Sequence, residues 1–403
     1  MIPDSQIPIA SPAVAKRFAL RLAVVYGAVF GLTGISLPYF PVWLKAVGVD
    51  VWWIGIITAM PALTRFTVLP FVTGFAERRR LLQQAIVVLA TLTSFGFLVV
   101  GQFQQPVPIL LLFLLTACVW TPIIPMVDGY ALKGVRQYGF DYGPVRLWGS
   151  AAFIIGALAC GLLVDIVSAT RVIWVLAAMA LIGTLTSLRL QPLADLAASG
   201  PQPRATMLLR NPAFLAIIFT SALVQGSHAT LYSFASISWQ QAGLGGVTIS
   251  LLWSLGVVAE IIVFAISPRF TWSPVTLVAL GAASAALRWV LTAQHLPVPL
   301  LALIQTSHGL TFGLTQVGIV GLLLRHVPAH VMASAQGYLV AATGIVMSSA
   351  TIASGPLYAR YGEGAYYVMS AMALSGACLI LSARRRLAAP SETVQPHSAA
   401  SGG

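Results

Sequence analysis

The sequence predicts an all-α integral membrane protein whose twelve transmembrane helices form two six-helix, pseudo-symmetric repeats. Three observations support this fold class. The residues are 58% hydrophobic and only 8% charged, the apolar residues gather in long runs, and the two halves of the chain match at a fixed offset. Ordinary soluble domains are about 25% charged. The bilayer is therefore the solvent that most of this chain requires.

Long apolar runs mark the predicted membrane helices, since a spanning helix needs about 20 mostly apolar residues. The runs in the first half are 19–43, 52–74, 82–103, 107–131, 143–166 and 171–188. Those in the second half are 212–238, 247–267, 274–293, 298–324, 332–356 and 364–383. The domains predicted from them are a cytoplasmic N-terminal tail at 1–18, an N-terminal half at 19–188, a cytoplasmic linker at 189–211, a C-terminal half at 212–383 and a disordered cytoplasmic tail at 384–403.

Basic residues are unevenly distributed among the loops. With the N-terminus in the cytoplasm, sixteen of the 22 Lys and Arg residues lie on the cytoplasmic side, and only Lys45, Arg171 and Arg360 lie in outer loops. Cytoplasmic loops carry this excess in membrane proteins, so both termini are predicted to be cytoplasmic. The net charge of +12 then reflects topology, and we expect no nucleic-acid partner.

An internal repeat links the two halves. A shift of 195 residues places "GLTGISLPYFPVWLKAVG" at 31–48 on "GSHATLYSFASISWQQAG" at 226–243, so that Gly48 falls on Gly243. The same shift places Arg65 on Glu260. Such repeats are typical of secondary transporters, whose substrate site lies between the repeats near the membrane midplane.

Five charged residues remain at membrane depth: Arg65, Asp128, Arg146, Glu260 and Arg288. Each costs at least about 2.5–3.5 kcal/mol on insertion scales, so a functional role is the default interpretation and structural ion pairs are the alternative. Arg146 lies in the first turn of its predicted helix, where positive charge is unfavourable. We therefore expect it to pair with Asp128, and Glu260 to pair with Arg288.

These charges predict an anionic substrate and a route for a proton. Three cations face two acids, and the surplus positive charge suits a carboxylate, which a guanidinium binds through two parallel hydrogen bonds. A buried acid gains or loses a proton as a nearby arginine changes partner. Proton and substrate movement would then be coupled.

Polar residues recur at helical spacing in two predicted helices, and such stripes favour cavity lining over lipid contact. The stripes are Ser221, Gln225, His228, Tyr232 and Ser236, and Gln305, His308, Phe312 and Gln316. Tyr26, on a similar face of the first helix, and Trp253 add aromatic surface for an aromatic or amphiphilic substrate, although packing histidines and interfacial aromatics are the alternative. The three cysteines lie in apolar segments and are interpreted as packing residues. The sequence has no ATP-binding motif, catalytic triad or metal-ligand cluster, so we expect no enzyme activity, no cofactor and no metal.

Several motifs resemble the major facilitator superfamily, and in particular its 3-phenylpropionate permease branch, which is related to lactose permease and nucleoside–proton symporters. They are "DYGPVRLWGSAAFIIG", "QGSHATLYSFASISWQQAG" and "LLWSLGVVAEIIVFAIS". The loop "GFAERRR" at 74–80 resembles the cytoplasmic signature of that superfamily, with Gly74, Glu77 and Arg78 in place as a predicted gate loop.

The resemblance implies roles for individual residues. Asp128 and Arg146 match positions that shape the substrate site, while Glu260, Arg288 and His308 match the proton-coupling network. An acid found one turn after that histidine in lactose permease is absent here, which places more of the coupling on Glu260. The resemblance further implies a multi-pass protein of the bacterial inner (plasma) membrane that acts as a monomer among membrane lipids.

The predicted function is proton-coupled uptake of a small aromatic organic acid, such as 3-phenylpropionate, by alternating access. Arg146, Arg288 or Arg65 would hold the carboxylate, and Glu260 or Asp128 would carry the proton. Substrate-lining residues would be Tyr26, Gln225, His228, Tyr232, Trp253 and His308. The alternatives are proton symport of a neutral nucleoside or sugar, efflux, and a transporter-like sensor.

Overall fold

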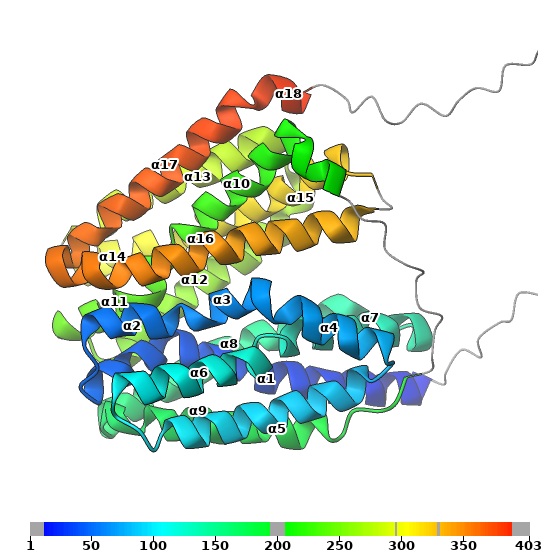
Figure 1. Ribbon diagram of the computed structural model, residues 1–403, viewed down its shortest axis with the longest axis vertical. Coiled ribbons are helices and arrows are strands. Elements are labelled where there is room, and N and C mark those ends of the chain that lie inside the picture. The colour runs from blue at the N-terminus through cyan, green and yellow to red at the C-terminus, as the bar shows by residue number, and fades with distance from the viewer. Residues whose placement is uncertain (1–11, 194–205, 295, 329–330, 389–403) are drawn as a thin grey trace, which may run out of the picture. The chain divides into compact units, whose positions relative to one another are not determined.

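The computed structural model describes residues 12–193, 206–294, 296–328 and 331–388, and all regular structure within them is helical (Figure 1). These residues contain ten helical stretches long and apolar enough to cross a membrane, and an eleventh if the bent pair Val51–Thr67 and Leu69–Arg78 is one span. One of the ten, Met332–Ser382, holds two helices joined by a short 3₁₀ turn at Gly362–Gly364. Each of the twelve predicted runs is therefore helical.

The helices follow the predicted runs closely. In the first half they are α1 (Pro12–Ala46), α2 (Val51–Thr58), α3 (Met60–Thr67), α4 (Leu69–Arg78), α5 (Leu82–Val100), α6 (Pro106–Trp120), α7 (Ile123–Tyr138), α8 (Tyr142–Ile166) and α9 (Val172–Ser187). In the second half they are α10 (Pro212–Gly226), α11 (Ala229–Gln241), α12 (Gly246–Ile266), α13 (Pro274–Thr292), α14 (Val298–Thr306), α15 (Thr315–His326), α16 (Met332–Tyr361), α17 (Ala365–Ser382) and α18 (Arg384–Ala388).

Four predicted helices are interrupted. Prolines stand at the start of α3 and α4, and the second of these breaks bends the chain by 43°. Pro122 separates α6 from α7. Proline removes a backbone donor and clashes with the preceding turn, which explains these breaks. The other two interruptions contain no proline: α10 and α11 part at Ser227 and His228, and a π-helix at Gly309–Leu314 separates α14 from α15.

By packing, the chain divides into two compact units. Of the described residues, unit 1 comprises 12–193, Ala229–Val257 and Ser348–Ala365, and unit 2 comprises 206–228, the described part of Val258–Met347 and 366–388. Parts of the predicted C-terminal half thus pack with the N-terminal half. The compact units do not divide the chain at the predicted linker, so the predicted boundaries of the two six-helix halves stay a prediction.

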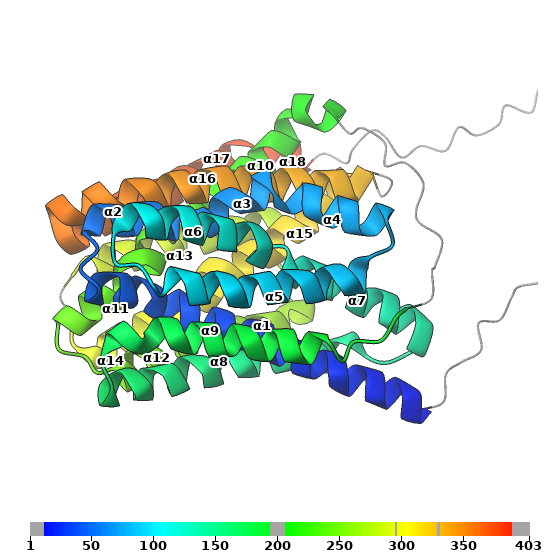
Figure 2. The ribbon, with the colours of Figure 1, turned by 60° about the horizontal axis from the view of Figure 1, so that its bottom comes forward.

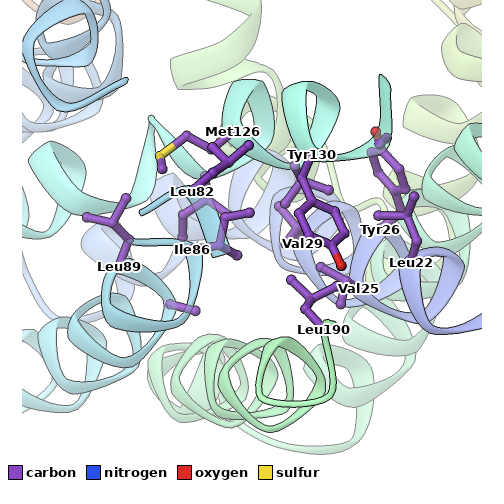
Figure 3. Packing of buried hydrophobic residues seen from close by; sticks show 14 of the residues in the cluster. Leu22, Val25, Tyr26, Val29, Leu82, Ile86, Leu89, Met126, Tyr130 and Leu190 are labelled. Carbon is purple, nitrogen blue, oxygen red and sulfur yellow. The ribbon is translucent and has the colours of Figure 1, made fainter. Parts of the chain in front are cut away.

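Unit 1 is built around α1, which lies along α8 and α9, while α5 lies beside α9 (Figure 2). A continuous apolar core joins α1, α5 and α7 (Figure 3). Tyr130 of α7 points toward Leu190 in this core, and its hydroxyl both donates to the Gln191 carbonyl (2.6 Å) and accepts from the Gln191 amide (3.0 Å). These bonds fix the end of the first half against α7.

Unit 2 has its own apolar core, which corrects the prediction that the C-terminal tail is disordered from residue 384. Leu387 is buried in that core, and the His326 ring donates to its carbonyl (3.1 Å). Residues 384–388 are therefore the helix α18 and not the start of a disordered tail; 389–403 lie outside the described residues. At the other end, α1 begins at Pro12, inside the predicted tail 1–18. In the predicted linker, 194–205 lie outside the described residues, and Thr206–Arg210 form a 3₁₀ turn.

The internal repeat is confirmed in backbone geometry. Gly48 and Gly243 both have φ of 86°, a left-handed conformation that favours glycine at the end of a helix. The residue after each glycine closes the same turn, with Val49 N–H bonded to the Leu44 carbonyl (3.0 Å) and Leu244 N–H to the Trp239 carbonyl (2.9 Å). Both contacts are related by the predicted shift of 195 residues.

Within unit 1, the start of α12 is held by α8 and α1. The Asp165 carboxylate accepts hydrogen bonds from Gly246 N–H (2.5 Å) and Val247 N–H (3.0 Å). Tyr39 donates to the Gly246 carbonyl (2.7 Å), and Ser250 donates to the Ala157 carbonyl (2.7 Å). A Cβ on Gly246 would clash with the Gly161 carbonyl oxygen, so only glycine permits this approach. By the predicted topology these contacts lie at the outer end of the helices.

The predicted gate loop 74–80 is mostly helical, which corrects that prediction. Gly74, Glu77 and Arg78 lie in the last turns of α4, and a Cβ on Gly74 would meet the Arg78 guanidinium at 3.2 Å. The helix ends only after Arg78, since none of these residues disfavours helix strongly enough to end it sooner. Arg80 then turns the chain with φ of 57°.

Arg80 provides a test of this turn. An L-residue in the left-handed region is disfavoured by about 1–2 kcal/mol, whereas glycine is not. We expect Arg80→Gly to be about 1 kcal/mol more stable than Arg80→Ala, as measured by unfolding in mixed micelles. The alanine variant controls for loss of the side chain, and equal stability of the two variants would contradict the assigned backbone conformation.

Candidate functional site

The first charged cluster lies in unit 1 and centres on Asp128. The hydroxyls of Tyr26 and Tyr142 donate to Asp128 Oδ1 at 2.5 and 3.0 Å, and Arg146 Nε lies 3.8 Å from the same oxygen. The predicted Asp128–Arg146 ion pair is therefore present. About a third of each of the two charged side chains is exposed, so solvent reaches the pair.

Aromatic rings complete the environment of Arg146. Its guanidinium carbon lies 4.0 Å from the centroid of the Phe30 ring and 5.5 Å from that of Tyr26. A cation over an aromatic face is attracted to it. These contacts and Asp128 offset the unfavourable position of a positive charge near the start of α8. Asp141 occupies the N-cap position of that helix but makes no capping hydrogen bond.

The second charged cluster lies in unit 2 around Arg288, which is 2% exposed. Its guanidinium donates to Gln305 Oε1 (2.8 Å), His308 Nδ1 (3.0 Å) and Thr311 Oγ1 (3.2 Å). The ring of Trp289 packs 4.8 Å from its guanidinium carbon. Arg288 is thus held by the segment that runs from α14 into the π-helix.

The donors and acceptors assign the tautomer of His308. A guanidinium can only donate, so Nδ1 of His308 must accept and its proton resides on Nε2. His308 Nε2 lies 3.8 Å from Glu260 Oε2. His308 therefore lies between Arg288, to which it is hydrogen-bonded, and Glu260, which is at ion-pair distance. It accepts a proton on Nδ1 only when Arg288 moves away.

His228 extends this network. It lies at the break between α10 and α11, and its Nδ1 donates to the Val224 carbonyl (3.1 Å). Its Nε2 consequently accepts, and the Thr311 hydroxyl lies 3.4 Å away. The Trp289 ring meets the imidazole edge to face at 4.9 Å. The described bonds run from Arg288 through Thr311 to His228, so the cluster acts as one hydrogen-bonded unit.

Two features of this cluster are typical of functional sites. Gln305 is 3% exposed, yet its Nε2 has no hydrogen-bond partner among the described residues. An unsatisfied buried donor is costly, so the Gln305 amide is available to donate a hydrogen bond to a bound molecule. The π-helix at Gly309–Leu314 begins directly after His308, and such segments occur frequently at functional sites.

A third group lies in unit 1 around Tyr232 of α11. Its ring stacks on Trp253 at 6.1 Å, and the Trp253 indole N–H donates to Ser236 (2.9 Å). Arg65 of α3 carries its charge within electrostatic range of the Tyr232 hydroxyl. The hydroxyls of Thr58 and Ser233 are 2.9 Å apart and join α2 to α11 nearby.

Comparison with known proteins decides the family. The family model described as "MFS_1 like family" matches residues 19–369. The chain belongs to this family of the major facilitator superfamily. A probable 3-phenylpropionic acid transporter of Escherichia coli (strain K12) is 30% identical over 362 residues, which cover 88% of this chain and 94% of that protein. A maltose permease of Geobacillus stearothermophilus is 25% identical, over 91% of this chain and 93% of that protein.

Solved structures show the same fold for this MFS_1-like protein. The nucleoside transporter NupG superposes with a TM-score of 0.79 at 19% identity, covering 91% of this chain and 98% of that one. A bacterial homolog of the human lysosomal transporter Spinster gives a TM-score of 0.73 at 12% identity, covering 94% of this chain and 98% of that one. The chain is thus a multi-pass membrane transporter with the major facilitator fold, and not an enzyme.

The structure of this MFS_1-like transporter distributes the predicted site residues over three groups. Tyr26, Asp128 and Arg146 form the first, and the second contains His228, Glu260, Arg288 and His308. Arg65, Tyr232 and Trp253 form the third, while Gln225 is buried in α10. Sequence reasoning missed Tyr142 and Trp289. Tyr142 is the first residue of α8, and nothing in the sequence indicates that its side chain reaches Asp128 of α7.

Proposed function

We propose that the protein is a proton-coupled importer of a small aromatic organic acid, with 3-phenylpropionate as the first candidate. The similarity to the probable 3-phenylpropionic acid transporter supports the substrate class. This relative in Escherichia coli fits a bacterial inner membrane, and the distribution of basic residues supports cytoplasmic termini. Protons are the proposed partner, lipids surround the chain, and a monomer suffices.

The observation that carries proton coupling is the position of His308, which is hydrogen-bonded to Arg288 and lies at ion-pair distance from Glu260. Glu260 is the proposed proton carrier, and the imidazole is the group that senses whether Arg288 is engaged. When Glu260 takes a proton, its attraction for the His308 N–H falls. Arg288 and the imidazole can then change partners, which links protonation to rearrangement of the cluster.

The substrate carboxylate requires a cation at membrane depth. The candidates are Arg65, Arg146 and Arg288. Asp128 and Tyr26 form part of the surroundings of Arg146. The aromatic side chains beside these groups, Phe30, Trp253 and Tyr232, suit a ring-containing substrate. Gln225, His228 and His308 provide polar lining in the proposal.

The test is the initial rate of 3-phenylpropionate uptake into proteoliposomes, with and without an inward proton gradient. Protein-free vesicles are the control, because the neutral acid crosses lipid unaided. We expect a protein-dependent rate that the gradient increases and that excess unlabelled acid suppresses. One pH unit is worth about 1.4 kcal/mol, or a tenfold concentration ratio for symport of one proton.

The same vesicles test the neutral-solute alternative. The maltose permease similarity makes a sugar the first competitor to examine, and a nucleoside the second. Competition by either solute, together with no protein-dependent uptake of the aromatic acid, would contradict the proposal. It would instead support symport of a neutral solute.

A further inference from the structure

Two of the three intramembrane arginines are already occupied by protein groups. Arg146 lies 3.8 Å from the Asp128 carboxylate and over the Phe30 ring. Arg288 is fully buried and donates to three side chains. A substrate carboxylate binding to either residue would have to displace existing contacts, and for Arg288 it would also have to enter a buried position.

Arg65 differs from both in its surroundings. It lies midway along the span formed by α2, α3 and α4, and its side chain is exposed. Within the described ranges of the chain, no carboxylate lies at ion-pair distance from its guanidinium, and the polar group within its electrostatic range is the Tyr232 hydroxyl. An uncompensated charge at this depth is among the most costly features a membrane protein can keep.

The neighbours of Arg65 fit an aromatic acid. Tyr232 stacks on Trp253, which is itself fixed by the hydrogen bond from its indole to Ser236. The Thr58–Ser233 contact holds α2, which precedes Arg65, against α11, which carries Tyr232. A guanidinium can bind a carboxylate through two parallel hydrogen bonds. The stacked rings provide an apolar surface for the remainder of the acid.

We propose that Arg65 binds the carboxylate of the transported acid and that the stacked Tyr232 and Trp253 rings contact its apolar body. This assignment rests on the proposed function and selects one arginine from three. Under this assignment, Arg65 has a counter-ion only when the acid is bound. Without substrate, the charge has no carboxylate partner among the described residues, and binding of the acid neutralises it.

The assignment predicts opposite effects of Arg65→Gln on stability and binding. Removal of an intramembrane charge that has no protein counter-ion leaves the melting temperature of the ligand-free protein equal to or higher than that of wild type, because no partner is left behind. Removal of a charge that has a protein partner is destabilising, so Asp128→Asn is expected to lower the melting temperature of the ligand-free protein. Binding of 3-phenylpropionate to Arg65→Gln is expected to weaken at least tenfold, and Arg65→Lys to recover part of the loss.

The experiment is calorimetric titration of the purified full-length protein with 3-phenylpropionate and with its uncharged amide, 3-phenylpropanamide. Arg65→Gln is expected to retain its affinity for the amide, which shows that the site is folded, and to lose only the preference for the acid. Arg360→Gln is the matched control, since Arg360 is an exposed arginine beside a tyrosine ring. It should bind both ligands as wild type does.

The outcomes separate this assignment from the proposed function. If wild type binds the acid and Arg65→Gln binds it equally well, the aromatic-acid function stands and the role of Arg65 is wrong. A marked fall in the melting temperature of Arg65→Gln would likewise overturn the assignment, because it would show a structural partner. If wild type binds neither ligand, the aromatic-acid function itself fails.

Discussion

Glu260→Gln is expected to abolish the stimulation of uptake by an inward proton gradient while leaving substrate exchange intact. Glutamine keeps the size of the side chain but cannot gain or lose a proton. His308 Nε2, 3.8 Å from the carboxylate, would then face a permanently neutral group. The expected loss is the full gradient effect, which at equilibrium is an accumulation ratio of about tenfold for one pH unit. It is measured as uptake above protein-free vesicles.

Asp141→Asn is the control for this experiment. Asp141 is an exposed acid beside α8 whose side chain makes no capping bond, so its removal changes charge without touching the Glu260 cluster. Its gradient effect should equal that of wild type. Persistence of the full gradient effect in Glu260→Gln would assign the proton to Asp128 or His308 instead.

Asp165→Ala is expected to loosen the contact between α8 and the start of α12. The carboxylate accepts two backbone N–H groups of α12, where the positive end of the helix dipole favours a negative charge. Hydrogen bonds to charged groups are worth about 1.5–3 kcal/mol each when buried. Because Asp165 is exposed, we expect about 1.4 kcal/mol in total, or a tenfold larger population in which this contact is open.

Cys160 is a native reporter of this contact. It is 1% exposed and precedes Gly161, which faces the Tyr39 hydroxyl and the Gly246 carbonyl. In a background that carries Cys118→Ser and Cys378→Ser, alkylation of Cys160 by a maleimide should be about tenfold faster in Asp165→Ala.

The matched control is Asp50→Ala, which removes a carboxylate that caps α2 without bonding α12. Alkylation of Cys160 should proceed at the wild-type rate in this variant. An unchanged rate in Asp165→Ala would mean that the glycine approach and the Tyr39 bond hold α12 without the carboxylate.

The sequence by itself determined the membrane class, the helical runs and the internal repeat. Hydropathy acts along the chain, because each stretch of about 20 residues must satisfy the bilayer independently of the others. A glycine that ends a helix is likewise a local requirement. The match of Gly48 with Gly243 was therefore visible in the sequence, and the two residues have the same φ in the structure. Local reasoning also paired Asp128 with Arg146, because Asp128 lies on one helix, Arg146 lies on the next, and a short connection joins the two helices.

The tertiary structure alone decided which partner each remaining charge takes. It placed His308 in contact with both Glu260 and Arg288, and it brought Tyr142 to Asp128. It also left Arg65 within electrostatic range of the Tyr232 hydroxyl and without a carboxylate partner in the described residues. These contacts depend on the rotation of each helix and on its breaks, above all the π-helix after His308. Packing sets both, because the bilayer rewards an apolar surface but does not specify which polar groups meet inside it.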